Sequence, residues 1–97
     1  MRDIVVQVST ELVDIYSQMA AHYENKEDEE SSNLALQYLE NCLEAATKGN
    51  NMEKEGFICH KIGLLYLNKK DFKKALSFQL RDLQIAKEML SDVYSFE

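Results

Sequence analysis

The sequence contains no proline, no tryptophan and only 3 glycines among 97 residues. A chain so poor in turn-forming residues does not make the many tight reversals of a β-sandwich or β-barrel, which excludes an all-β fold. It also lacks any run of about 18 apolar residues, the length that a membrane-spanning helix needs. Hydrophobic residues still make up 45% of the chain, too many for a disordered segment. We therefore expect one small domain over residues 1–97.

Basic residues are outnumbered: 11 Lys and Arg stand against 17 Asp and Glu, for a net charge of −6. Nucleic acids and anionic membranes bind basic surfaces, so neither is an expected partner. Two cysteines without a CxxC pair favour a reducing, cytoplasmic setting. No metal site is expected, because Cys42, Cys59, His22 and His60 lack ligand spacing. Three scattered glycines do not form a phosphate-binding loop, and no catalytic motif is present, so we expect neither a cofactor nor an enzyme.

Apolar residues recur three and four apart in four blocks, and this predicts four helices. The first covers residues 3–24 and is followed by an acidic loop at 25–33, whose closing serines would cap a second helix at 34–48. Gly49 is then expected to end that helix in the left-handed conformation. Asn50, with a glutamate three residues later, predicts the start of the third helix.

A turn at residues 68–71 separates the third block from the fourth, and Asp71 is the expected cap of the fourth helix. The residues predicted to face the core are Ile4, Val5, Val8, Leu12, Ile15, Tyr16, Met19, Ala20 and Tyr23 in the first block, Ala35, Leu36, Leu39, Cys42, Leu43 and Ala46 in the second, Cys59, Ile62, Gly63 and Tyr66 in the third, and Phe72, Ala75, Leu76, Leu83, Ala86 and Leu90 in the fourth.

The second and fourth blocks match each other at a constant distance of 40 residues. The pairs are Ala35 with Ala75, Leu36 with Leu76, Tyr38 with Phe78, Leu43 with Leu83 and Ala46 with Ala86. The first and third blocks match at a distance of 43, in Tyr16 with Cys59, Met19 with Ile62, Ala20 with Gly63 and Tyr23 with Tyr66. A helical hairpin repeated at this period is typical of an α-solenoid. We expect one repeat at about 3–48, a second at about 50–90, and a stub of a further helix, or an extension of the last one, at 91–97.

The second repeat resembles a tetratricopeptide repeat. The residues that carry the resemblance are Ile62-Gly63-Leu64-Leu65-Tyr66, then Lys70-Asp71-Phe72, then Ala75. The segment from Ala75 to Glu88 is closer to a subclass with repeats of about forty residues, which includes Leu-Gly-Asn-repeat regulators of G-protein signalling and some ciliary and axonemal proteins. Cys59 stands where the family favours Trp, and Lys70 where its turn usually has Gly. The resemblance implies stacked antiparallel hairpins whose concave face holds a peptide or helix of a partner.

The resemblance also indicates which residues would bind the partner. These are Phe57, His60, Leu64 and Leu67 in the third block and Asp14, Ser17 and Ala21 in the first. Chaperone-binding members of the family hold a carboxylate with a Lys, Asn and Arg set. His60 and Leu64, or Ser17 and Ala21, stand at the matching positions, so we expect a more apolar or helical ligand.

The predicted function is a non-catalytic protein–protein interaction module, as a scaffold segment of a longer array in a cytoplasmic and, by the resemblance, ciliary or cytoskeletal assembly. The open C-terminal end would join further repeats or a second copy, because a solenoid of two repeats buries little surface. The alternative is a self-associating four-helix bundle with a structural role and no peptide groove. Small-angle scattering separates the two, since a solenoid is extended and a bundle is compact.

Overall fold

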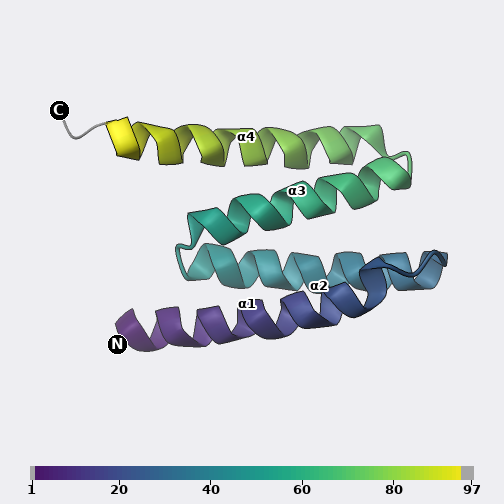
Figure 1. Cartoon of the computed structure of the whole chain (residues 1–97), viewed down its shortest axis with the longest axis horizontal. Coiled ribbons are helices and arrows are strands. Elements are labelled where there is room, and N and C mark those ends of the chain that lie inside the picture. The colour runs from purple at the N-terminus through teal and green to yellow at the C-terminus, as the bar shows by residue number, and fades with distance from the viewer. Residues whose placement is uncertain (1, 95–97) are drawn as a thin grey trace. The chain divides into compact units, whose positions relative to one another are not determined.

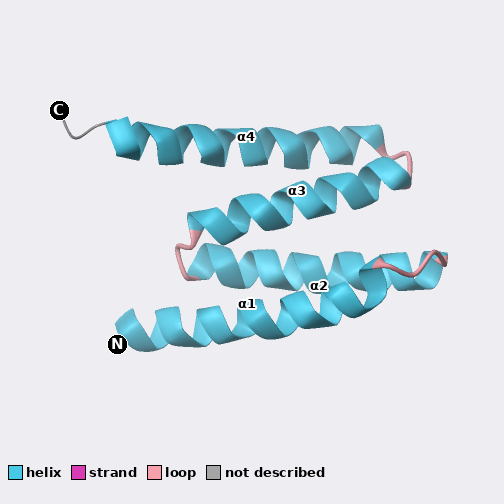
Figure 2. Cartoon of the chain, in the orientation of Figure 1, coloured by secondary structure: helices cyan, strands magenta, loops and turns pink. Residues whose placement is uncertain are grey.

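The computed structural model describes residues 2–94, and side-chain surroundings are described for residues 4–91. The described residues form four α-helices and no strand (Figure 1, Figure 2). These helices are α1 (Arg2–Glu24), α2 (Glu29–Lys48), α3 (Met52–Asn68) and α4 (Phe72–Tyr94). The predicted all-α class is therefore confirmed. The expected stub begins as an extension of α4, which continues to Tyr94, and residues 95–97 lie outside the described part.

The chain divides into two compact units, residues 1–51 and 52–97. In the first unit, α1 packs against α2, and we call this pair hairpin 1; in the second, α3 packs against α4 as hairpin 2. Within each hairpin the two helices run antiparallel (Figure 1). The loops that join the two helices of each hairpin, shown in pink in Figure 2, are short. A short loop places consecutive helices side by side in opposite directions.

The loop of hairpin 1 is shorter than predicted. It covers residues 25–28 only, because Asp28 caps α2: its side chain accepts a hydrogen bond from the backbone N–H of Ser31 at 2.9 Å. This bond and one from the Ser31 hydroxyl hold the pKa of Asp28 below its ordinary value of 3.8, since both favour the charged carboxylate. The prediction that the serines cap the helix was wrong. Glu29 and Glu30 instead form the first turn of α2, where carboxylates suit the helix dipole.

The end of α2 also differs from the prediction. Gly49 has φ of −85°, and the left-handed residue is Asn50, with φ of 55°. The backbone N–H of Asn51 donates to the Ala46 carbonyl at 2.9 Å, and that of Asn50 donates to the Thr47 carbonyl at 3.1 Å. This pair of bonds is a Schellman motif, which satisfies the last carbonyls of a helix. Asn50 therefore ends α2 rather than starting α3, and α3 begins two residues later.

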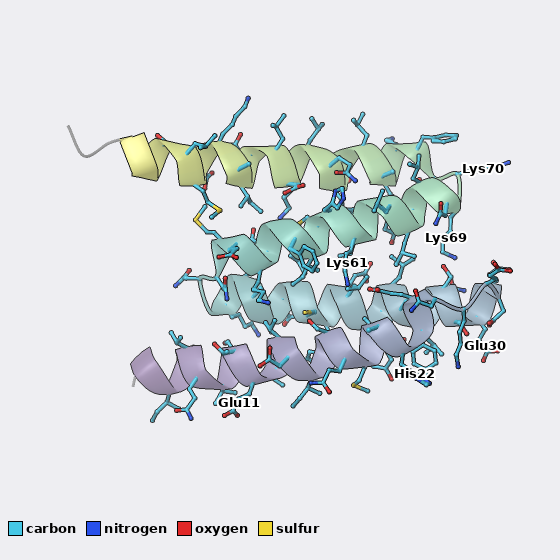
Figure 3. The ribbon with its side chains drawn as sticks, viewed as in Figure 1. Glu11, His22, Glu30, Lys61, Lys69 and Lys70 are labelled. Carbon is cyan, nitrogen blue, oxygen red and sulfur yellow. The ribbon has the colours of Figure 1, made fainter. Side chains whose placement is uncertain are left out.

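A second Schellman motif ends α3. Lys70 has φ of 63°, and the N–H groups of Lys70 and Asp71 donate to the carbonyls of Leu67 and Tyr66, both at 2.9 Å. Asp71 then caps α4, as predicted, by accepting a hydrogen bond from the Lys74 backbone N–H at 3.2 Å. The lysine thus occupies a backbone conformation that glycine adopts without steric cost. Figure 3 shows Lys70 at this turn, pointing outward.

We expect Lys70→Gly to stabilise the chain by about 1 kcal/mol, because it removes the steric cost of a side chain in the left-handed region. Urea unfolding followed by circular dichroism measures the change. Lys69→Gly is the matched control, since Lys69 lies outside the positive-φ region and gains nothing from the loss of its side chain. Equal effects of the two substitutions would contradict this account of the turn.

The two hairpins repeat the same internal packing. In hairpin 1 the rings of Tyr23 and Tyr38 stack with centroids 6.0 Å apart and planes at 16°. In hairpin 2 the rings of Tyr66 and Phe78 stack at 5.8 Å, also at 16°. These pairs occupy matching positions of the sequence repeat.

The small residues at the matching positions are buried as well. Ala20 and Ala35 are fully buried in hairpin 1, and Gly63 and Ala75 are buried in hairpin 2. An added Cβ at Gly63 would lie 2.6 Å from the Gln79 side-chain nitrogen, so the Gln79 side chain of α4 packs directly against Gly63. The small residues therefore lie on the packed side of each hairpin, as predicted.

The predicted core of α2 is confirmed, and that of α3 largely so. All six predicted residues of α2 are buried, as are Cys59, Ile62 and Gly63 of α3, whereas Tyr66 is half-buried. Leu39 and Ile62 are among the largest fully buried side chains described.

The predicted core of α1 and α4 was mostly wrong. On α1 the buried residues are Ser9, Val13 and Ala20, and on the described part of α4 they are Ala75 and Ile85. The residues predicted to be buried but found exposed are Ile4, Val5, Val8, Leu12, Ile15 and Met19 on α1, and Phe72, Leu76, Leu83, Ala86 and Leu90 on α4. Each of these helices carries a second apolar stripe beside the one that packs in its hairpin.

Candidate protein-binding faces

The predicted binding residues of hairpin 2 form one exposed stripe of α3, which we call the α3 face. It consists of Phe57, His60, Leu64 and Leu67, at steps of three, four and three residues that keep them on one side of a helix. Phe57 is 57% exposed, and Leu64 and Leu67 are 44% and 48% exposed. The opposite side of α3 carries the buried Cys59 and Ile62, which hold the helix against α4. The prediction that these four residues lie away from the packed stripe is confirmed.

A lysine flanks the apolar part of the α3 face. The Lys61 ammonium lies 5.1 Å from the centroid of the Phe57 ring, within range of a cation–π contact (Figure 3 labels Lys61). Glu53 lies one turn before Phe57 and is also exposed. The face therefore combines three large apolar side chains with a cation at its edge.

His60 is tied to α4 by polar contacts. Its Nδ1 lies 3.3 Å from the Gln79 side-chain oxygen, and the Gln79 amide donates to the His60 carbonyl at 3.5 Å. An Asp82 carboxylate oxygen lies 3.9 Å from the same Nδ1. Arg81 pairs with Glu55 of α3 at 3.2 Å beside them. These contacts fix the orientation of the imidazole at the edge of the α3 face.

The predicted residues of hairpin 1 do not form an equivalent face. Asp14 and Ala21 are exposed, but Ser17 is half-buried, and its hydroxyl lies 3.3 Å from the Cys42 sulfur of α2. In the sequence repeat, Ser17 corresponds to His60, and Cys42 corresponds to Asp82. Both hairpins therefore have a polar contact between their two helices at this position, although the side chains that make it differ. Of the three predicted residues of hairpin 1, Ser17 is therefore the one whose side chain contacts α2 within the hairpin.

Neither cysteine is an exposed thiol. Cys42 and Cys59 are both free and fully buried. Burial raises the pKa of the Cys59 thiol above its usual 9.0, with the Glu55 and Asp82 carboxylates adding to the rise and Arg81 opposing it. Cys59 is therefore a protonated, unreactive core residue. Among the described residues, no group of three or more His, Cys, Asp and Glu side chains is placed to hold a metal ion.

The described part of hairpin 1 carries small clefts. One, of about 120 Å³, is lined by Ser9, Leu12, Tyr16, Asn41, Glu44, Ala45 and Lys48. The other, of about 290 Å³, is lined by Gln18, Met19, His22, Tyr23 and Tyr38. Both adjoin the exposed apolar stripe of α1, through Leu12 and Met19.

Comparison with known proteins found no match: no family model, no curated protein and no solved structure. The tetratricopeptide resemblance therefore rests on the residues quoted for it above. None of the helices in the described part of the chain has the length and apolar character needed to cross a bilayer.

The exposure of the apolar stripes on α1 and α4 was not predicted from the sequence. One available signal was the spacing of the α1 residues, which alternates between three and four. This spacing is typical of a helix with a seam for a second helical partner. The contribution of Gln79 and Asp82 to the His60 site was also missed, because it depends on how α4 is rotated against α3.

Proposed function

We propose that the chain is a non-catalytic protein–protein interaction module that binds an amphipathic helix of a partner protein on the α3 face. The observation that supports this proposal is the exposure of Phe57, Leu64 and Leu67 on a helix whose other side is packed in hairpin 2. An exposed apolar stripe of this kind is typical of a surface that receives a helix. The buried thiols and the absence of a recognised catalytic motif in the sequence favour binding over catalysis.

The charged edge of the α3 face indicates the chemistry of the partner. Lys61 lies beside the Phe57 ring at the edge of the face, and an acidic residue beside the apolar stripe of the incoming helix would pair with it. A neighbouring cation discriminates between partners by charge more than it adds affinity. The proposed partner is therefore a helix with apolar residues at steps of three and four and a carboxylate on its flank. We place this module in a cytoplasmic, scaffold-type assembly, in line with its resemblance to ciliary and cytoskeletal repeat proteins.

The test begins with photo-crosslinking. A photoreactive amino acid at position 64 should crosslink to a partner helix in extract, whereas the same amino acid at the exposed Ser77 of α4 should not. With the captured partner purified, we expect Leu64→Asp to weaken binding at least tenfold, because the interface would bury an unpaired carboxylate. Titration calorimetry measures the dissociation constant.

The matched control is Ser77→Asp, which adds the same charge to hairpin 2 away from the α3 face. It should leave the dissociation constant within about twofold of the original, a change well below 1 kcal/mol. Circular dichroism of both variants should show unchanged helix content, since both positions are exposed. Equal loss of binding in the two variants, or full binding by Leu64→Asp, would reject the α3 face as the site.

A further inference from the structure

The exposed apolar stripe of α1 has the spacing of a helix-pairing seam. We call the residues Val5, Val8, Leu12, Ile15 and Met19 the α1 outer face. Successive members are three, four, three and four residues apart, and each is between 37% and 53% exposed. The side of α1 that packs in hairpin 1 carries Ser9, Val13 and Ala20 instead. Apolar residues in alternating steps of three and four pack against another helix by inserting side chains between those of the partner.

The last helix carries a comparable stripe. The α4 outer face consists of Phe72, Leu76, Leu80, Leu83 and Leu90, each between 51% and 63% exposed. Leu76, Leu83 and Leu90 are seven residues apart and so lie in one line along the helix. The side of α4 that packs in hairpin 2 carries Ala75 and Ile85. The described residues thus form a large apolar face on α1 and another on α4.

The two faces belong to hairpins of different charge. Residues 1–51 contain 3 basic and 10 acidic residues, for a net charge of −7, whereas residues 52–97 contain 8 basic and 7 acidic residues, for a net charge of +1. The described side chains of α1 include three carboxylates and no Lys or Arg, while those of α4 include four basic and two acidic groups. The apolar faces therefore differ in the charge that surrounds them.

Charged residues flank each face directly. Glu11 follows Val8 by three residues and precedes Ile15 by four, and Figure 3 shows it on the side of α1 away from α2. On α4, Lys73 precedes Leu76 by three residues, and Lys87 follows Leu83 by four. Charges at the edges of an apolar seam determine which helices pair and in which orientation.

From these observations we infer that the α4 outer face of one copy docks on the α1 outer face of a second copy. This pairing brings Lys73 and Lys87 toward the acidic surface of hairpin 1. Pairing two α1 faces would instead bring together two hairpins of net charge −7, which mutual repulsion disfavours. The surfaces differ from the α3 face, so this inference does not depend on the proposed binding function.

A head-to-tail contact leaves one face open at each end of a dimer. Such an interface is heterologous, and it generates rings or open chains rather than closing at two copies. The size of the assembly should rise with protein concentration, and it should fall with added salt because the flanking charges are screened.

The test uses two variants of the full chain in sedimentation velocity. The first, Leu12→Lys with Ile15→Lys, disables the α1 outer face; the second, Leu76→Lys with Leu83→Lys, disables the α4 outer face. We expect the original chain to form species larger than a dimer and each variant alone to sediment as a monomer of 11.2 kDa. An equal mixture should form a 1:1 dimer, since each variant retains the face that the other lacks. Added lysines on both disabled faces repel each other and prevent further growth.

The control carries the same number of added charges off both faces, as Gln7→Lys with Ser77→Lys, and should assemble like the original chain. Unchanged helix content by circular dichroism shows that a monomeric variant is folded. An original chain that stays monomeric at all concentrations would overturn the inference. So would a mixture that stays monomeric while either variant dimerises alone, because that result assigns a symmetric contact to a single face.

Discussion

Leu43→Ala should destabilise the chain by about 3 kcal/mol, whereas Leu83→Ala should change its stability by less than about 0.5 kcal/mol. The two leucines occupy the same position of the sequence repeat, yet Leu43 is 7% exposed and Leu83 is 51% exposed. Removing a buried leucine side chain loses its transfer free energy and leaves a cavity, whereas removing an exposed one loses little. Repeat position alone predicts equal effects, so this pair separates sequence pattern from structure.

Urea unfolding of both variants measures the difference. The protein should be dilute, because Leu83 belongs to the α4 outer face and self-association would add to its apparent stability. Leu36→Ala and Leu76→Ala form a second pair at matching repeat positions, with 7% and 59% exposure. Similar losses from both members of either pair would mean that α4 is covered in the folded chain, contrary to the structure.

Gly49→Ala should destabilise hairpin 1 by about 2 kcal/mol. A Cβ added at Gly49 would lie 2.9 Å from the Cβ of Ser9 on α1, closer than such atoms approach in real structures. The Ser9 Cβ is bonded to the backbone and cannot swing away, so α1 and α2 would have to separate. Overpacking of this kind typically costs 1–3 kcal/mol. Thermal and urea unfolding both measure the loss.

A double-substitution cycle isolates the contact at Gly49. Ser9→Gly removes the opposing Cβ, so Gly49→Ala should cost less in that background than in the original chain, whereas Ser9→Ala retains the Cβ and should give no such relief. An equal cost of Gly49→Ala in all three backgrounds would show that the effect comes from the backbone of Gly49 and not from the approach of the two helices.

Much of the fold follows from the sequence because it depends on local chemistry. The spacing of apolar residues predicts four helices, and Asp71 caps α4 where its position predicts. The apolar stripe predicted for α2, from Ala35 to Ala46, is buried. Two predictions were wrong for local reasons. The Asp28 side chain accepts a hydrogen bond from the Ser31 N–H, so α2 begins earlier than predicted. Asn50, and not Gly49, adopts the left-handed conformation at the end of α2.

The burial of α1 and α4 could not be predicted in the same way. Periodicity gives the direction of an apolar stripe on a helix but does not say which neighbour covers it. On α1 the packed side contains Ser9 and Val13, while the stripe with more large apolar residues, which includes Leu12 and Ile15, remains exposed. Small residues such as Ala20 and Gly63 lie on the packed side. The α3 face was predictable since it lies opposite Cys59 and Ile62.

Each hairpin contains one stacked pair of aromatic rings, which can serve as its own near-ultraviolet signal. With no tryptophan present, near-ultraviolet absorption and emission come mainly from 5 tyrosines, three of which belong to the Tyr23–Tyr38 and Tyr66–Phe78 pairs. Replacing Tyr66 by leucine silences the signal of one pair and leaves that of the other. Near-ultraviolet circular dichroism can thus follow the opening of each hairpin separately, without an attached dye.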